Sequence, residues 1–304
     1  MSRGKRYDME AKLNIKKVIA VIALIAVIIM FIIGIKKLLM ADGVNANAKV
    51  TSYFPVYTNE KWGVIDQDGK IIIDQEYTEM ITIPDTKTDI FIITYDVNYQ
   101  ENTYKTKVID SKGEEKFANY DLVEAIENID KNNNMWYEER VLKVKKDDKY
   151  GLIDYLGKEI LPLEYDSIES MQGITNSLII KKNENIGLCD NEGNIIIPVE
   201  YKEIKGIGED YKNGYIVKNS EDKYGLIDFT KNTILDPNYE EIKQVASTNI
   251  FIVKENGKLK AINKEKETLI ENKFDDIKQI NLKHLIYVKD QKYGIMNEKR
   301  RNKD

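Results

Sequence analysis

A short phrase recurs along most of this chain and restricts the fold more than any other feature. We aligned its copies on the glycine of Tyr150-Gly151-Leu152-Ile153-Asp154. The matching positions are Gly63, Lys107, Gly151, Gly187, Gly225, Lys260 and Gly294, at intervals of 44, 44, 36, 38, 35 and 34 residues. A period in this range is typical of proteins in which each repeat is one supersecondary unit.

The columns around these positions keep the same chemistry from unit to unit. Asp or Asn stands three residues after each position, and in four units a glycine follows three residues later. This is the pattern of a hairpin turn, because Asp and Asn bond their own main chain and tolerate left-handed backbone. An apolar pair and then an aromatic residue follow. The turn and aromatic columns read Asp66, Asp110, Asp154, Asp190, Asp228, Asn263 and Asn297; Gly69, Gly113, Gly157 and Gly193; and Tyr77, Tyr165, Tyr201, Tyr239 and Phe274.

The repeat predicts an all-β fold. Each unit contains three or four short apolar runs and no stretch of helical period. One such unit cannot bury its apolar face alone, whereas stacked neighbours can. We therefore predict an all-β tandem-repeat domain over residues 52–304, made of six full units and a terminal hairpin. A propeller-like ring suits this number of units, and an open β-solenoid is the alternative.

The motif itself resembles a known family. Lys61-Trp62-Gly63-Val64-Ile65-Asp66, with Tyr150-Gly151, Tyr224-Gly225 and Tyr293-Gly294 in the same columns, looks like the bacterial WG repeat, also called the KWG repeat. The resemblance covers about Ser52 to Asn297 and implies a β-rich module, often attached to a membrane segment, with no shared catalytic residues. It also implies structural roles for Trp62, Gly63, Tyr150, Gly151, Gly187, Tyr224, Gly225, Tyr293 and Gly294. Lys107 and Lys260 replace the glycine, so the second and sixth units are expected to be distorted or edge-like.

The first 51 residues predict a membrane anchor. Val18–Ile35 is a run of 18 residues without a polar side chain, long enough at about 1.5 Å per residue to cross most of a bilayer as a helix. We predict a basic cytoplasmic tail (1–17), a transmembrane α-helix (18–40) and a linker (41–51). A cleaved signal peptide ending at Ala46-Asn47-Ala48 is the alternative, although the apolar run is longer than usual for one.

Charge predicts the orientation and limits the partners. Six basic residues precede the apolar run and two follow it, which places the N-terminus in the cytoplasm and the repeats across the bacterial cell membrane. Residues 42–304 hold 38 basic and 49 acidic side chains. This negative balance argues against nucleic acid as a partner. The expected partners are the membrane and a protein or cell-envelope polymer.

The sequence offers little for catalysis. Cys189 stands in an apolar column occupied elsewhere by isoleucine, so it is interpreted as a small core residue. His284 is the one histidine, and no motif joins it to Cys189 or to a set of metal ligands. Acidic residues recur in every unit, as structural residues do. We therefore predict no catalytic, metal or cofactor-binding residues and no cofactor.

Two groups of aromatic residues are candidate ligand contacts. Trp136 and Tyr137 lie in an insertion before the third unit, where they either contact a ligand or fold back over the second unit. Tyr77, Tyr165, Tyr201 and Tyr239 either form an exposed ladder or pack between units. The resulting hypothesis is a non-enzymatic, single-pass, extracytoplasmic binding or scaffold module. The alternatives are a carbohydrate-active cell-envelope enzyme and a purely structural spacer.

Overall fold

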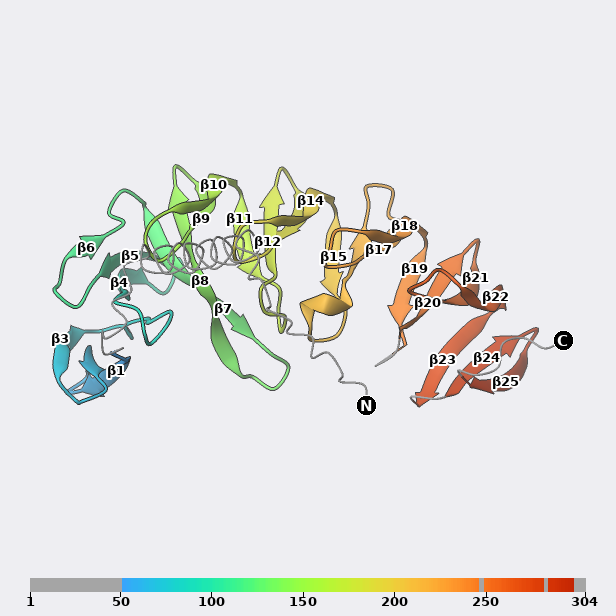
Figure 1. Ribbon diagram of the computed structural model, residues 1–304, viewed down its shortest axis with the longest axis horizontal. Coiled ribbons are helices and arrows are strands. Elements are labelled where there is room, and N and C mark those ends of the chain that lie inside the picture. Colours follow the sequence, from blue (N-terminus) through green and yellow to red (C-terminus); the bar gives the residue numbers. More distant parts are fainter. Residues whose placement is uncertain (1–50, 246–248, 282–283, 298–304) are drawn as a thin grey trace, which may run out of the picture. The chain divides into compact units, whose positions relative to one another are not determined.

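The computed structural model describes residues 51–245, 249–281 and 284–297 (Figure 1). By its internal contacts the chain divides into two units, Met1–Val50 and Thr51–Asp304, and the account below concerns the second. The expected transmembrane helix (18–40) and the cleavage motif lie outside the described residues. Within the described residues, no helix combines the length and apolar character needed to cross a bilayer.

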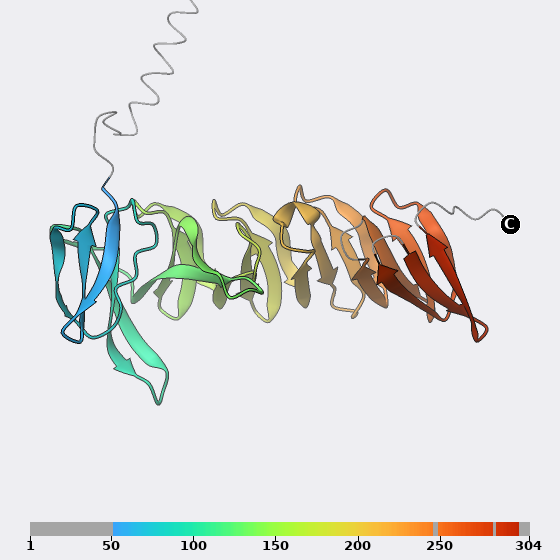
Figure 2. The same ribbon diagram turned by 90° about the horizontal axis from the view of Figure 1, so that it is seen from below.

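The described residues confirm the all-β prediction. They form seven antiparallel sheets, which we number along the chain, and in each sheet consecutive strands are neighbours (Figures 1 and 2). The first three sheets are β1 (Tyr53–Thr58), β2 (Lys61–Asp66) and β3 (Ile71–Tyr77); β4 (Phe91–Asn98), β5 (Thr103–Ile109) and β6 (Glu115–Lys116); and β7 (Leu122–Ile129), β8 (Met135–Lys146), β9 (Lys149–Ile153) and β10 (Glu159–Tyr165).

The remaining sheets continue this plan. The fourth is β11 (Ser167–Ser170), β12 (Leu178–Lys182), β13 (Asn185–Cys189) and β14 (Ile195–Tyr201), and the fifth is β15 (Glu203–Gly206), β16 (Tyr215–Lys218), β17 (Tyr224–Ile227) and β18 (Thr233–Tyr239). The sixth is β19 (Glu241–Gln244), β20 (Ile250–Glu255), β21 (Lys258–Asn263) and β22 (Thr268–Phe274), and the seventh is β23 (Asp276–Asn281), β24 (His284–Lys289) and β25 (Lys292–Asn297). A 3₁₀ turn, η1 (Tyr211–Asn213), precedes β16.

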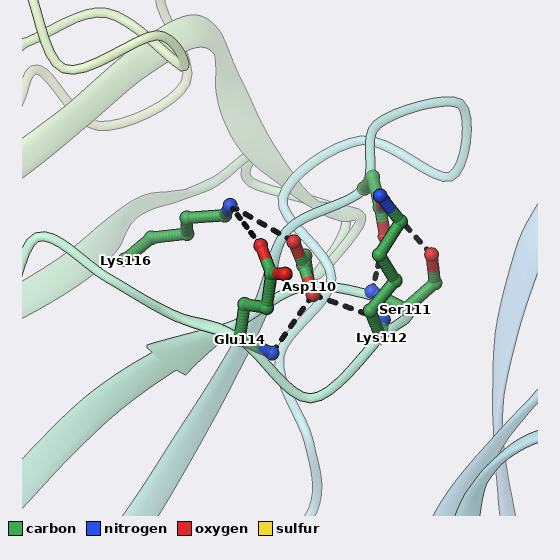
Figure 3. A network of polar contacts seen from close by, with 6 residues as sticks. Asp110, Ser111, Lys112, Glu114 and Lys116 are labelled. Atoms are coloured by element: carbon green, nitrogen blue, oxygen red, sulfur yellow. Dashed lines mark hydrogen bonds and ion pairs between the residues drawn. The ribbon is translucent and has the colours of Figure 1, made fainter.

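The repeated Asp opens the hairpin turns as predicted. At Asp110 the side-chain Oδ1 accepts hydrogen bonds from the main-chain N–H groups of Lys112 and Glu114, both at 2.9 Å (Figure 3). Gly113 closes the turn with φ of 78°, a left-handed geometry that suits glycine. The same pair of hydrogen bonds from main-chain N–H groups to the Asp Oδ1 occurs at Asp66, Asp154, Asp190 and Asp228.

Packing between sheets forms the core. Each buried cluster joins side chains of two consecutive sheets, as where Leu188 and Ile197 of the fourth sheet meet Tyr215 and Val217 of the fifth. Cys189 is fully buried in the cluster between the third and fourth sheets. The core is therefore a series of similar seams, one between each pair of neighbouring sheets, and it holds the repeats together.

The two units without the motif glycine differ from each other. In the second sheet the strand after the turn, β6, is reduced to two residues, so this unit is distorted as expected. The sixth sheet has its full four strands, so the expectation of distortion is wrong there. Lys260 is accommodated because its Nζ lies 5.2 Å from the ring centre of Tyr239 and 2.6 Å from the Glu255 carboxylate.

Candidate ligand-binding cavity

A cavity of about 930 Å³ lies beside the insertion that precedes the third unit. One wall is the stretch of β8 from Trp136 to Arg140. The others are the β9–β10 turn with the start of β10, the loop before β12, and the β13–β14 turn. The cavity therefore lies between the third and fourth sheets, and its most distinctive wall comes from a segment that the other repeats do not share.

An irregular strand pairing shapes the β8 wall. Strand β8 has 12 residues and pairs with β7 along its length. Between the pairs Ala125↔Leu142 and Glu127↔Tyr137, strand β7 has one residue, Ile126, whereas β8 has the four residues 138–141. Arg140, in this bulge, has φ of 62°, a backbone conformation that non-glycine residues adopt rarely. A bulge of this kind re-aims side chains, and here Glu138 is buried while Glu139 and Arg140 are exposed.

Glu138 locks this wall to the fourth sheet. It is 2% exposed. Its Oε1 accepts a hydrogen bond from Nδ2 of Asn128 at 2.8 Å, and its Oε2 accepts from the main-chain N–H of Asn176 at 2.9 Å and from Nδ2 of Asn191 at 3.0 Å. The three donors come from β7, the loop before β12 and the β13–β14 turn. One carboxylate therefore fixes three walls of the cavity relative to one another.

Asn128 extends this buried network. It is 1% exposed. Its Nδ2 also donates to the carbonyl oxygens of Met171 and Ile174, and its Oδ1 accepts from the N–H groups of Ile129 and Gly173. All side-chain polar atoms of Glu138 and Asn128 are hydrogen-bonded, and satisfied buried polar groups rigidify their surroundings. The insertion is thus anchored to the body of the domain and does not hang free.

Two buried polar atoms in cavity-lining residues lack partners among the described residues. They are the indole Nε1 of Trp136 and the side-chain Oδ1 of Asn191. An unsatisfied buried polar atom is costly.

The charges around the cavity are mostly negative. Its lining holds five carboxylates and two basic groups, from Glu138, Glu139, Asp154, Glu159 and Glu192 against Arg140 and Lys158. Glu139, Glu159 and Glu192 are exposed. In the part of the chain that the structure describes, no hydrogen bond or ion pair occupies these three carboxylates, so they are available to a ligand.

The structure brings Trp136 and Tyr137 together on the cavity wall. Trp136 is partly buried, opposite Asn128 in the strand pairing. Tyr137 is also partly buried, and burial raises the pKa of its hydroxyl. Both residues line this cavity, and their role as ligand contacts stays a prediction.

The repeated tyrosines do not gather in one place. Tyr77, Tyr165, Tyr201 and Tyr239 each pack against the buried cluster of a different pair of sheets. Tyr165 is only 5% exposed, and burial raises its pKa to about 12. Burial is also the main cause of the raised pKa of Tyr77 and Tyr201. These positions favour the packing interpretation over an exposed ladder.

The motif residues lie at the centre of the sheets. Trp62, Tyr150 and Tyr224 stand opposite Tyr77, Tyr165 and Tyr239 on the neighbouring strand. Gly63, Gly151, Gly187 and Gly225 each face the main chain of the following strand so closely that an added Cβ would approach a carbonyl oxygen within 2.6–2.8 Å. In the seventh sheet, by contrast, Tyr293 is 80% exposed beside Gly294.

Sequence reasoning missed the residues that hold the cavity together: Asn128, Glu138, Asn176 and Asn191. A usable signal existed, because Asn128 and Glu138 lie near the two ends of the insertion (128–139) and have no counterpart in other units. The sequence gives no sign that the loop before β12 would meet them. Elsewhere, His284 begins β24, and the described residues contain no group of three or more His, Cys, Asp or Glu able to hold a metal ion.

Comparison with known families agrees with the repeat. The model of the WG containing repeat matches residues 62–82, 150–173, 186–217 and 224–258. The chain carries WG repeats at these four places. The matched WG repeats contain Gly63, Gly151, Gly187 and Gly225, whereas Lys107 and Lys260 fall outside the matched segments.

Likeness to solved structures is weak. The WD40 β-propeller domain of Doa1 is 10% identical with a TM-score of 0.25, over 73% of this chain and 75% of that one. Hsv2p of Kluyveromyces lactis is 9% identical with a TM-score of 0.29, over 78% and 86%, and a eukaryotic initiation factor is 10% identical with a TM-score of 0.30, over 80% and 82%. No curated protein matches the chain.

Proposed function

We propose that this chain is a non-enzymatic binding module that takes a lysine- or arginine-bearing segment of another protein in the cavity beside β8. The observation that carries the proposal is the rigid, acidic cavity built on a non-repeated insertion. Repeated residues serve the fold in every unit, whereas the insertion adds a wall that stacking does not need. Loops and insertions placed on a rigid repeat scaffold are common sites of binding.

The chemistry of the cavity selects the ligand class. Glu139, Glu159 and Glu192 offer free carboxylates, and Trp136 supplies an aromatic surface in the same cavity. Carboxylates attract ammonium and guanidinium groups, and tryptophan is the best aromatic partner of a cation. Because Glu138 is already held by three donors, the cavity is organised before the ligand arrives, which lowers the entropic cost of binding.

The test is a binding measurement on the full chain in detergent micelles, with a short oligolysine peptide as the probe and an oligoglutamate peptide of equal length as the control. We expect oligolysine to bind, with affinity falling as salt rises, and oligoglutamate not to bind. Glu192→Lys should weaken oligolysine binding about tenfold or more. Glu169→Lys, on the exposed side of β11 and away from the cavity, should leave it unchanged. Equal effects of the two substitutions would refute the cavity as the site.

The location of the module is part of the same proposal. The apolar run Val18–Ile35, with six basic residues before it and two after it, supports a single-pass anchor in a bacterial membrane with the WG repeats outside the cytoplasm. Protease added to intact, wall-stripped cells should then digest the repeats. Protection, in cells where a known external protein is cut, would place them in the cytoplasm.

One observation favours the alternative of a carbohydrate-active enzyme: non-repeated carboxylates and Trp136 share a cavity. Release of reducing sugar from cell-wall polymer, lost in Glu139→Gln or Glu192→Gln and kept in Glu169→Gln, would establish that alternative. We expect no release from the wild-type chain.

A further inference from the structure

The seams between sheets follow one rule. We call the residue directly after the motif position the front residue of a sheet. The residue two places after the motif position pairs with a residue of the preceding strand, and we call that partner the rear residue of the sheet. In five seams the front residue of one sheet and the rear residue of the next share a buried cluster. The pairs are Val64 with Phe91, Val108 with Leu142, Leu152 with Leu178, Leu188 with Tyr215, and Leu226 with Phe251.

Burial of these two columns is nearly complete. Each of the ten residues is at most 1% exposed. Two residues of the same columns break the rule. Phe54, the rear residue of the first sheet, is 43% exposed, and Ile295, the front residue of the seventh sheet, is 63% exposed. The columns that form the core elsewhere are therefore bare on one face of each terminal sheet.

Neighbouring side chains on the same two faces are also more exposed than their counterparts in the inner sheets. On the rear face of the first sheet, Ile65 is half-buried, whereas its counterparts Ile153, Cys189 and Ile227 are at most 5% exposed. On the seventh sheet, Tyr293 is 80% exposed beside Ile295. Exposed apolar surface of this kind, contiguous on a sheet, marks a contact face.

We propose that these two faces bind each other between copies of this chain, with the front face of the seventh sheet of one copy packed on the rear face of the first sheet of the next. Five seams show that a front residue and a rear residue of these shapes pack together, so the chain already contains both halves of one more seam. The partner is a second copy because the described structure leaves both faces exposed, as a chain closed on itself would not.

The contact is head-to-tail, and this has two consequences. A contact between two different faces repeats from copy to copy and yields short open arrays unless it closes into a ring. The added seam is also smaller than an inner one, because the described part of the seventh sheet has three strands and lacks the fourth, which supplies Ile197 and Leu235 in the fourth and fifth sheets. We therefore expect weak, concentration-dependent association.

Cysteine pairing on the full chain in detergent micelles tests the proposal. In a Cys189→Ala background, one preparation carries Phe54→Cys and a second carries Ile295→Cys. A short bifunctional maleimide is added to each alone and to their mixture. We expect dimers in the mixture, at least about tenfold above either preparation alone, because only the mixture brings a rear face against a front face with both thiols present. A chain carrying both cysteines should give a ladder of dimers, trimers and longer products.

Leu156→Cys is the matched control. Among the described residues, Leu156 is the most exposed large apolar residue, at 91%, and it lies in the β9–β10 turn outside the buried clusters of the seams. Mixed with Phe54→Cys, it should give only the background level of dimers.

Three results would overturn the proposal. The first is a mixture that gives no more dimer than the Leu156→Cys control. The second is dimers from Ile295→Cys alone, which would mean that β25 edges pair with each other. The third is a doubly substituted chain that links only within itself, which would mean that the two faces meet in one molecule.

Discussion

Glycine is required at the motif position because two strands approach each other closely there, and not because the chain turns. A Cβ on Gly225 would lie 2.7 Å from the carbonyl oxygen of Leu235 and 2.9 Å from the main-chain nitrogen of Pro237. Both obstacles are main-chain atoms, so no rotamer change relieves them. The register of β17 and β18 shifts at this point, between Tyr224 and Leu226. The glycine therefore allows a bulge that brings the following strand close.

Gly225→Ala should lower the free energy of unfolding by about 2–3 kcal/mol, because even one methyl group forces the two strands apart. Denaturant unfolding of the substituted and wild-type chains measures this. Gly257→Asn is the control, since Gly257 has open space around it and φ of 74°, which asparagine tolerates. A change below about 0.5 kcal/mol for Gly225→Ala would show that the sheet adapts easily.

Substitution at the glycine position of the hairpin turns should instead stabilise the chain. Lys231 and Lys266 stand where other units have glycine, with φ of 72° and 64°. This conformation costs a residue with a Cβ about 1 kcal/mol. Lys231→Gly should therefore stabilise the chain by up to about 1 kcal/mol in thermal or denaturant unfolding. Lys243→Gly, on strand β19, should destabilise it by a similar amount; the same sign for both would contradict the argument.

Asp110 links the turn to pH. Its carboxylate is 5% exposed and lies 2.9 Å from Nζ of Lys116 (Figure 3). The hydrogen bond with Lys116 holds the pKa of Asp110 below its usual range, against the effect of burial. Since the pKa is lower in the folded state, this stabilisation is present above the unfolded value of about 3.9 and is lost as pH falls through the lower folded value.

Asp110→Asn should therefore lower the melting temperature at neutral pH, and the difference from wild type should shrink as the pH falls below about 4. Asparagine keeps the turn, as Asn263 shows by accepting from the N–H of Glu267 at 2.8 Å, so the loss reports the charge. Asp236→Asn, at an exposed position on β18, is the control. A difference that stays constant from pH 7 to pH 3 would rule out Asp110 as the titrating group.

At the scale of elements, polar contacts help to fix the position of the β7–β8 hairpin. Ile126 and Val141 of the hairpin lie in an apolar seam, and Glu138 and Asn128 add a polar connection to the loop before β12. Ser170 adds a hydrogen bond from its Oγ to the carbonyl oxygen of Glu127, at 2.6 Å. The cavity should therefore change shape when this network is cut, even though the repeats persist.

Glu138→Ala should lower the free energy of unfolding by about 1–3 kcal/mol, because it leaves the part-buried main-chain N–H of Asn176 without its acceptor and removes an acceptor from Asn128 and Asn191. It should also weaken oligolysine binding more than Trp136→Ala does, since it releases three walls at once. Glu138→Gln should have an intermediate effect on stability, because one amide oxygen remains as an acceptor. Unchanged unfolding and binding in Glu138→Ala would show that the network does not position the cavity.

The elements that could be predicted from the sequence are those that recur. Turns such as Asp190 to Gly193 could be predicted because seven copies of the same column show which residue types recur and which vary. The cavity was only half readable. Trp136 stood out as an aromatic in a polar insertion, but Asn176 and Asn191 come from other elements, and nothing in their local sequence indicates that Glu138 would meet them.

The choice between a propeller-like ring and an open β-solenoid depends on information that a repeat does not carry. Stacking of one unit on the next is fixed by columns such as Leu188 and Tyr215, whereas closure depends on small angles added over every seam. The columns did contain a usable signal about the ends. Phe54 and Ile295 belong to buried columns of terminal sheets, so a core residue without a neighbouring sheet was foreseeable.

At the scale of the whole domain, similar seams in series predict that opening starts from an end. In such an array each sheet is stabilised by its own strands and by its two neighbours. Among the described sheets, the sixth is separated from the end of the series only by the three-stranded seventh sheet, on which Ile295 is exposed, whereas at least two sheets lie on either side of the third and fourth sheets. Opening free energies should therefore fall toward the C-terminal sheets.

Thiol labelling can measure this gradient. Burial raises the pKa of Cys189 to about 12, so the folded thiol is both covered and protonated and should react only after opening. In a Cys189→Ala background, Ile153→Cys and Ile262→Cys place the same substitution in the same buried column, at positions 1% and 3% exposed. We expect Ile262→Cys to label at least about tenfold faster, equivalent to ~1.4 kcal/mol less opening free energy. The exposed Leu156→Cys gives the unprotected rate. Equal rates for the two buried positions, both following global unfolding, would mean that the seams break together and that the repeats form one cooperative unit.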